Sequence, residues 1–255
     1  MDMHTPPGME TGLGPLGATA EVPRFSYAFQ PIVDVVTREV FSYEALIRGP
    51  GNEPAWQVLE RVPAHQKYRF DQDSRIVAIA LAARLGLDRH LNLNFLPHAL
   101  CVSADSISST LEAAVRNHLP VDRIILEVTE GEMIADHAQF AAQLNEYRRM
   151  GMKVAIDDFG AGYSGLNLLA DFQPDQVKID MNLVRGIERH GPRQAIVRAV
   201  AQACADLGID VIAEGVESMQ EYQWFADQGV RLFQGYLFAR PGFEGLPAAH
   251  CPEPL

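Results

Sequence analysis

The feature that most constrains this chain is an alternation between short apolar runs and longer amphipathic stretches. Each run is short enough for one strand and rich in β-branched or other apolar residues. The runs are Tyr27–Val33, Val40–Ile47, Leu91–Phe95, Arg123–Val128, Lys153–Ile156, Gln176–Ile179, Val211–Ala213 and Leu232–Tyr236. Apolar strands separated by helices predict parallel pairing with both faces of the sheet covered.

Helices are expected between most of these runs, and several of them end at a glycine, which is typical of a helix C-terminus. They are Phe70–Leu85, Ser106–Leu119, Asp136–Met150, Arg193–Leu207 and Met219–Gln228. Eight expected strands in a chain of 255 residues suit one closed β/α barrel, with an open doubly wound sheet as the alternative. The first two runs have no helix between them, so they could form an antiparallel hairpin, which an ordinary β/α barrel lacks.

Composition excludes some classes of protein. The formal net charge of −12 argues against a general nucleic-acid binder, because such proteins usually present a basic face. A phosphate substrate stays possible where metal ions reverse the local field. Hydrophobic residues make up 47% of the chain, enough for a buried core. No apolar run approaches the roughly 18 to 20 residues that a membrane span needs, so we expect no membrane insertion.

The two ends of the chain are expected to be tails. Residues 1–22 lack the basic start and apolar stretch of a secretory signal and are rich in Gly, Pro, Met and Thr. We expect one globular domain over 23–245 and a C-terminal tail over 246–255. The three cysteines, Cys101, Cys204 and Cys251, are far apart and odd in number. This pattern favours a reducing cytoplasm over a disulfide framework.

Polar side chains gather in and directly after the expected strands, several of them at strand ends. They are Glu44, Arg48, Asn94, Glu127, Asp157, Asp158, Lys178, Glu214 and Gln234. In a β/α barrel the C-terminal strand ends meet at one mouth, where active sites lie. We therefore expect these residues, scattered in sequence, to converge in space.

The chemistry of this set predicts a metal centre. It holds five carboxylates and neither His nor Cys. Five like charges in a confined site cannot all stay ionised without cations. Ligand sets made only of oxygen select Mg²⁺ or Mn²⁺ rather than a structural zinc. Two such ions, roughly 3.5–4 Å apart, are the arrangement used for in-line phosphoryl displacement. A set of unconnected salt bridges is the alternative.

Spacing adds detail at two places. Glu44 and Arg48 are four residues apart, so both point to the same side of a strand. The pair suits a metal ligand beside a phosphate-binding guanidinium, or equally a plain structural ion pair. Asp157 and Asp158 are adjacent and would face opposite sides of a regular strand. For both to reach a metal ion, the strand must end there.

The loop after these aspartates imitates a different motif. Residues 160–165 read G-x-G-x-x-G between a strand and a helical stretch, and Asp180 ends the next strand, as in a dinucleotide-binding fingerprint. However, Asp157 and Asp158 stand directly before the loop and would repel a pyrophosphate. This strand–loop–helix unit also lies in mid-chain, with several strand–helix units before it. We therefore interpret the loop as shaping the mouth beside the metal ions.

At these residues the sequence resembles the EAL-domain family of bacterial cyclic di-GMP phosphodiesterases. The signature triplet is Glu44-Ala45-Leu46, within YEALIRGP. Further blocks follow in the family order: LNLNF, EVTE, DDFGAGYSGL, VKID, AEGVE and QGYLFARP. The resemblance extends from about Tyr27 to Pro241. It implies an α/β fold, a modified TIM-like (β/α)₈ barrel with one antiparallel strand.

The resemblance also implies roles for individual residues. Metal ligands correspond to Glu44, Asn94, Glu127, Asp157, Asp158 and Glu214, which would hold two Mg²⁺ or Mn²⁺ ions. Lys178 corresponds to the lysine that contacts the attacking water, and Glu214 has also been proposed in the family as the general base. Substrate-binding positions correspond to Gln30, Arg48 and Gln234.

Residues around this set are implied to support it. Glu130 corresponds to the glutamate that anchors the glycine-rich loop, where Gly160 and Gly162 lie, and Glu217 to a further polar site position. The implied reaction is hydrolysis of cyclic di-GMP to linear pGpG. Members commonly dimerise near this loop and the following helix, here about Leu166–Phe172, so a homodimer is expected.

One departure from the family pattern is Gly49, where many members carry Trp after the signature arginine. It removes no ligand but could alter base packing or a neighbouring loop. Two alternatives to the enzyme stay open. One is a catalytically inactive cyclic di-GMP receptor that acts through a protein partner, which typically lacks metal or loop residues; here all are present. The other is a hydrolase of a different phosphodiester.

Overall fold

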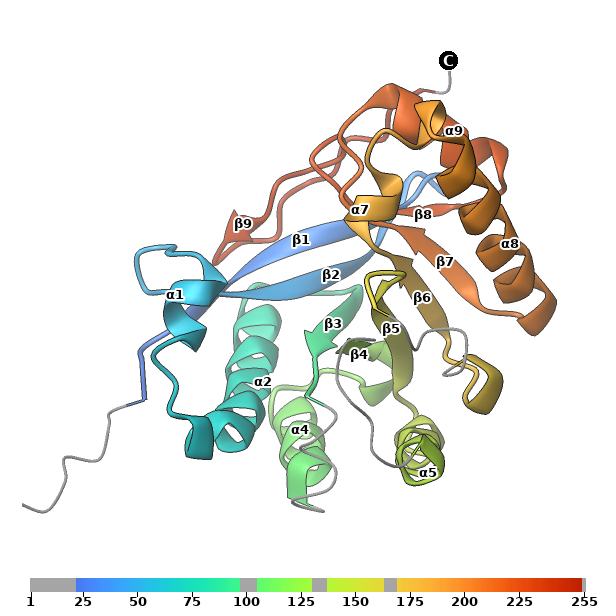
Figure 1. Ribbon diagram of the computed structural model, residues 1–255. Helices are drawn as coiled ribbons and strands as arrows, with labels where there is room; N and C mark the ends of the chain where they lie inside the picture. Colours follow the sequence, from blue (N-terminus) through green and yellow to red (C-terminus); the bar gives the residue numbers. More distant parts are fainter. Residues whose placement is uncertain (1–21, 97–104, 130–136, 163–168, 254–255) are drawn as a thin grey trace, which may run out of the picture.

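The strands close into a ring (Figure 1). The computed structural model describes residues 22–96, 105–129, 137–162 and 169–253. Its strands are β1 Ser26–Asp34, β2 Glu39–Arg48, β3 His90–Asn94, β4 Ile124–Thr129, β5 Lys153–Phe159, β6 Gln176–Ile179, β7 Asp210–Ala213, β8 Leu232–Phe233 and β9 Gly242–Phe243. The order is β2-β3-β4-β5-β6-β7-β8-β1-β9, and β1 also pairs with β2. The closed barrel is therefore confirmed, and the open doubly wound sheet is wrong.

The first strand gives the barrel its modified form. Strands β2 to β8 pair in parallel, whereas β1 is antiparallel to both β2 and β8. The register of the β1–β2 hairpin places Ser26 opposite Arg48 and Gln30 opposite Glu44. The expected hairpin is thus present. All nine residues of β1 are buried, because other elements cover both of its faces.

Helices lie along the outside of the ring (Figure 1). The five longer helices agree with the expected amphipathic stretches to within about three residues at each end. They are α2 Lys67–Arg84, α4 Asp105–Arg116, α5 His137–Arg149, α8 Gly191–Leu207 and α9 Met219–Asp227. Helix α8 ends at Gly208, whose φ of 72° is the left-handed conformation that glycine adopts readily.

Short elements were not expected from the sequence. They are α1 Ala55–Leu59, α7 Met181–Val184, strand β9, and the 3₁₀ turns η1 Ala64–Gln66, η2 Val121–Arg123 and η3 Ile187–Arg189. Strand β8 is shorter than the expected 232–236. A Cβ at Gly235 would overlap the backbone of Val216, so the chain here lies against the turn after β7 instead of continuing the ladder.

The end of the chain packs against the barrel. Residues 246–253 include Leu246, Ala249 and Cys251, which contact the hydrophobic core. The Tyr43 hydroxyl donates a hydrogen bond to the Pro247 carbonyl (3.0 Å), and the His250 N–H donates to the Phe238 carbonyl (2.9 Å). Cys204 and Cys251 are free thiols, and Cys101 lies outside the described residues. Within the described residues no helix is both long and apolar enough to cross a membrane.

Candidate active site

Four carboxylates converge on one lysine at the barrel mouth. The Lys178 Nζ lies 2.7 Å from Glu214 Oε1, 2.8 Å from Glu127 Oε1, 3.0 Å from Asp157 Oδ1 and 3.3 Å from Glu44 Oε2. The lysine comes from β6 and is only 1% exposed. The carboxylates come from β2, β4, β5 and the residue directly after β7. We call these four carboxylates and Lys178 the mouth cluster.

A backbone irregularity brings a fifth carboxylate to this cluster. The pairing of β5 with β6 changes register between Ile156 and Phe159. Asp158 lies within this bulge at a φ of 54°, a left-handed conformation that aspartate tolerates better than most residues. Carboxylate oxygens of Asp157, Asp158 and Glu214 consequently lie within 4.8 Å of one another. The sequence suggested that the strand ends at these aspartates, but β5 continues to Phe159. The bulge, and not a strand end, directs both side chains toward the site.

Amide side chains hold the carboxylates in place. Gln234 Nε2 donates to Glu44 Oε2 at 2.7 Å, and Asn94 Nδ2 lies 3.5 Å from Glu44 Oε1. Asn92 Nδ2 donates to Glu127 Oε1 at 2.8 Å from a fully buried position. The sequence interpretation missed Asn92. Its signal is the spacing of two residues from Asn94, which places both amides on the same face of β3.

Burial and mutual repulsion shift the acidity of the cluster. Burial raises the pKa of Glu214 to about 8, with Asp157 and Glu44 adding to the effect and Lys178 opposing it. Burial likewise raises the pKa of Glu127 well above its usual value, and that of Asp158. Burial alone would lower the pKa of Lys178, but the surrounding carboxylates outweigh it and raise this pKa well above its usual value. The lysine therefore stays a cation.

The donor set fits divalent cations. Glu44, Glu127 and Asp157 form one group whose carboxylate oxygens lie within 4.8 Å, and Asp157, Asp158 and Glu214 form another. Among the described residues, the buried Glu127 Oε2 has no hydrogen-bond partner, a costly state for a carboxylate oxygen. Ligand sets made of carboxylate and amide oxygens are those that Mg²⁺ and Mn²⁺ prefer. Two groups that share Asp157 suit two neighbouring ions.

The other expected site residues take different places. Gln30 is buried, and its Nε2 donates to the Ala239 carbonyl at 3.1 Å. Arg48 is half-buried at the end of β2 and donates to the Ile47 carbonyl at 2.8 Å. Glu217 pairs with Arg185 (Oε1 to Nη2, 2.8 Å), outside the mouth cluster. Gly160 and Gly162 follow Asp158. Glu130 lies outside the described residues, as do residues 166–168 of the expected dimer segment 166–172.

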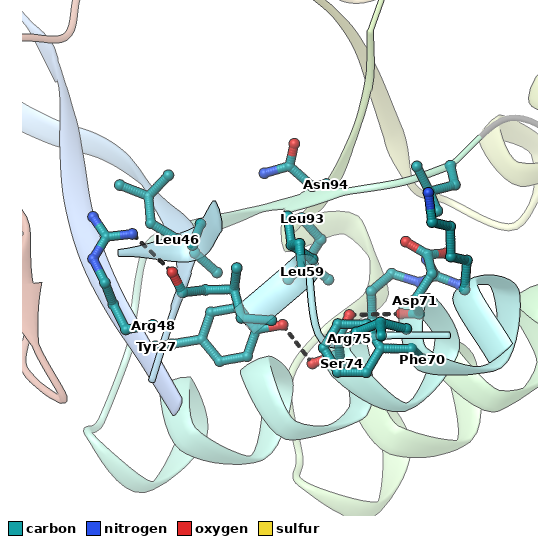
Figure 2. A pocket seen from close by; sticks show the side chains of 16 residues that line it. Tyr27, Leu46, Arg48, Leu59, Phe70, Asp71, Ser74, Arg75, Leu93 and Asn94 are labelled. Carbon is teal, nitrogen blue, oxygen red and sulfur yellow. Dashed lines mark hydrogen bonds and ion pairs between the residues drawn. The ribbon is translucent and has the colours of Figure 1, made fainter. Parts of the chain in front are cut away.

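An apolar pocket of about 390 Å³ lies between the end of β2 and helix α2 (Figure 2). We call it the side pocket. Asn94 lines it, so the pocket and the cluster share a wall. Leu59 of α1 and Phe70 of α2 contribute apolar surface. Arg75, 1% exposed, forms an ion pair with Asp71 in the pocket wall.

The loop that carries Gly49 connects β2 to α1 beside this pocket. The Gly49 N–H donates to the Glu53 carbonyl at 2.9 Å, and the Asn52 N–H donates to the Gly49 carbonyl at 2.9 Å. A Cβ at Gly49 would lie 2.2 Å from Glu53 Oε2, so the loop could admit a larger side chain only if the Glu53 carboxylate moved. Gly49 is therefore matched to a tight turn between β2 and α1.

The sequence pattern that defines the EAL domain matches residues 18–241 of this chain. The chain belongs to the EAL domain family. This agrees with the mouth cluster, whose residues fall in the blocks that suggested the resemblance.

Relatives with recorded roles are similar over much of this EAL domain. The blue light- and temperature-regulated antirepressor BluF of Escherichia coli is 36% identical over 228 residues, which cover 89% of this chain and 57% of BluF. The cyclic di-GMP phosphodiesterase RocR of Pseudomonas aeruginosa is 34% identical over 156 residues, covering 61% of this chain and 40% of RocR. The chain thus spans about half the length of these relatives.

Solved structures agree more closely. A standalone EAL protein from Vibrio cholerae, bound to c-di-GMP, is 50% identical with a TM-score of 0.85, covering 89% of this chain and 95% of that one. BlrP1 from Klebsiella pneumoniae, in complex with manganese and cyclic diGMP, is 43% identical with a TM-score of 0.84, covering 91% of this chain and 59% of BlrP1.

Proposed function

We propose that this EAL domain hydrolyses cyclic di-GMP to linear pGpG with the help of two Mg²⁺ or Mn²⁺ ions. The observation that carries the proposal is the convergence of four carboxylates from separate strands on the buried Lys178 Nζ, at 2.7 to 3.3 Å. Such an excess of buried negative charge suits a site completed by divalent cations. The similarity to the cyclic di-GMP phosphodiesterase RocR and to BlrP1 with manganese and cyclic diGMP supports the same substrate.

Six residues would hold the ions in this proposal: Glu44, Asn94, Glu127, Asp157, Asp158 and Glu214. Divalent ions at such a site lower the pKa of bound water and neutralise charge on the phosphoryl group. The Arg48 guanidinium, at the end of β2, suits a phosphate oxygen. Gln30 lies opposite Glu44 in the β1–β2 register, Gln234 donates to Glu44 Oε2, and both would contact the substrate.

Proton transfer divides between Lys178 and Glu214. Because its pKa is raised, Lys178 stays protonated and acts as a hydrogen-bond donor that orients the attacking water. Divalent ions held by Glu214 would keep its carboxylate ionised, the form that can accept a proton from water. The resemblance left both candidates open for the base; because Lys178 stays protonated, we favour Glu214.

Residues around the cluster are proposed to act indirectly. Glu130, Gly160 and Gly162 would hold the loop after β5, and Glu217 would act through its ion pair with Arg185. We also propose a homodimer and a cytoplasmic location. We propose the domain limits given above, 1–22, 23–245 and 246–255, as well.

Product analysis tests the proposal. The purified protein is incubated with cyclic di-GMP and Mg²⁺ or Mn²⁺, and nucleotides are separated by chromatography, with a parallel sample in chelator. We expect pGpG in the metal-containing samples and unchanged substrate in chelator. A panel of other phosphodiesters tests specificity. Full activity after exhaustive metal removal would overturn the metal-dependent mechanism.

A second candidate is a receptor that binds cyclic di-GMP without turning it over and acts on a protein partner. The observation that favours it is the 36% identity to BluF, which is named an antirepressor. The complete set of carboxylates argues for the enzyme, because a receptor needs no catalytic metal site. Tight binding of cyclic di-GMP with no pGpG in any metal would favour the receptor.

A further inference from the structure

The short helix α7 lies between the segment after β5 and the segment after β7, and each segment adjoins carboxylates of the proposed metal site. A Cβ at Gly160, two residues after Asp158, would overlap the Leu183 side chain. A Cβ at Gly215, directly after Glu214, would lie 2.7 Å from the Met181 Cβ. Both glycines have positive φ, 96° and 63°. One turn of helix thus touches the backbone after β5 on one side and the backbone after β7 on the other.

The start of α7 is fixed to the barrel. The Asp180 N–H donates to the Phe159 carbonyl at the end of β5 at 3.2 Å. The buried Asp180 carboxylate accepts hydrogen bonds from the Asn182 N–H at 3.0 Å and from Asn182 Nδ2 at 2.8 Å, which caps the helix. The helix therefore begins at a defined height above the strand ends.

The end of α7 is fixed to the segment between β7 and α9. The Gly186 N–H donates to Glu221 Oε1 at 2.9 Å, while Glu221 Oε2 accepts from the Glu217 N–H at 2.9 Å. Arg185 pairs with Glu217 at 2.8 Å. Glu221 also completes the capping box of α9 with Ser218. One carboxylate thus joins the end of α7 to the loop that follows Glu214.

We propose that α7 is a spacer that sets the separation between the Asp157–Asp158 pair and Glu214, with Leu183 and Met181 as positioning residues. This inference rests on the proposed metal-dependent function. The two glycines allow the helix to approach the loop backbones closely, and any displacement of α7 moves carboxylates from two different strands. Carboxylates that share metal ions must keep their spacing to within a few tenths of an ångström.

A purely structural role explains these contacts less well. A four-residue helix is too short to be stable on its own, so its anchors and packing must hold it. Met181 is 48% exposed, and Leu183 is only partly buried, so neither contributes as much burial as a core residue. Their contacts fall instead within two residues of metal-site carboxylates.

The Mn²⁺ affinity of the Leu183→Ala variant tests whether α7 acts as a spacer. The full chain is titrated with Mn²⁺ alone, free Mn²⁺ is measured by electron paramagnetic resonance, and thermal unfolding is recorded with and without metal. We expect about 10-fold weaker Mn²⁺ binding, the range for loss of a group that orients metal ligands. Leu183→Met, which nearly conserves volume, should restore binding. The matched control is Leu111→Ala, a partly buried leucine on α4, which should leave Mn²⁺ affinity unchanged.

If the Leu183→Ala variant does not fold, alanine substitutions at two glycines, Gly160 and Gly151, test the spacer in a second way. Gly160 and Gly151 have similar positive φ, 96° and 102°, but nothing lies within 4 Å of a Cβ at Gly151. Both alanine variants incur the same backbone strain. We expect only Gly160→Ala to weaken Mn²⁺ binding. Adding Leu183→Ala to it should cause less than the sum of the two losses, because the overlap is removed.

The outcomes separate the two proposals. Wild-type protein that binds no Mn²⁺ contradicts the metal-dependent function and the spacer with it. Wild-type protein that binds Mn²⁺ and loses it in Glu44→Ala, while Leu183→Ala and Gly160→Ala bind as tightly as wild type, overturns the spacer alone. Equal weakening in Leu111→Ala and Leu183→Ala also overturns it, because the effect would then be general loss of packing.

Discussion

The mouth cluster and the side pocket share Asn94 as a wall, yet they treat buried charge in opposite ways. In the cluster, four carboxylates face one cation, Lys178. In the pocket wall, Asp71 pairs with Arg75, and Arg75 also donates to the Thr110 hydroxyl (3.2 Å) and lies 4.7 Å from the centre of the Phe95 ring. Balanced buried charge is typical of structure, whereas an unbalanced set marks a site that is completed by something else.

The largest expected effect is on turnover, from Glu44→Ala in the mouth cluster. Glu44 lies between Lys178 and Gln234, and its loss removes a proposed metal ligand. We expect the rate to fall about 1,000-fold or more, while thermal unfolding stays cooperative because no core packing is lost. Steady-state assays with Mg²⁺ and circular dichroism measure the two. Wild-type turnover in the folded variant would remove Glu44 from the site.

Next comes Arg75→Met, which alters the pocket wall instead. The change removes the Arg75 guanidinium that pairs with the buried Asp71 carboxylate. We expect a loss of about 3–5 kcal/mol in the free energy of unfolding, with unchanged kcat per folded molecule. Urea unfolding monitored by circular dichroism, with active-site normalisation, provides the measurement. A variant that is as stable as wild type but has a reduced kcat would contradict the structural role of the Arg75–Asp71 pair and assign it to the reaction instead.

A smaller but more diagnostic effect is expected from Lys178→Ala. The lysine is assigned to the attacking water, so kcat should fall about 100-fold with little change in KM. Because the variant lacks the cation that contacts all four carboxylates, the metal-free variant should also melt below wild type. Mg²⁺ should reduce this difference in melting temperature. Weakened substrate binding with normal kcat would instead assign Lys178 to the phosphate.

The smallest expected effect is a pH dependence of stability without metal. The pKa of Glu214 is raised from its unfolded value to about 8, so between about pH 4.5 and 8 the folded state binds more protons than the unfolded state. Stability of the metal-free protein should therefore fall as pH rises through this window. Excess Mg²⁺, which binds the ionised form, should flatten or reverse the trend. Thermal melts at pH 6 and 8, with chelator or Mg²⁺, give the comparison.

Strand patterns and motifs predicted most of the barrel. The alternation of runs and helices located all eight strands of the ring, and the adjacency of the first two runs predicted the antiparallel hairpin. The blocks around Glu44, Glu127 and Asp157 predicted which side chains would meet, because parallel strands must end at the same mouth. These features depend on periodicity and on strand direction, which a sequence shows directly.

Features that depend on tertiary contacts could not be predicted in the same way. The bulge at Asp158 depends on how β5 pairs with β6, and the sequence suggested a strand end instead. Asn92 becomes important only because Glu127 lies opposite on the neighbouring strand. Helix α7 has four residues and no periodic signal; its position is set by contacts with Gly160 and Gly215.

The reversed direction of β1 has a consequence for how such a domain can be connected. Ser26 pairs with Arg48, so the chain enters the barrel at the same end where the parallel strands finish. In a barrel with eight parallel strands, a preceding segment would arrive at the opposite end, about one strand length from the chemistry. Here β1 begins at the rim of the mouth, because Ser26 lies opposite Arg48. A signal-receiving module fused there could act on substrate access directly, with no need to transmit a change through the barrel.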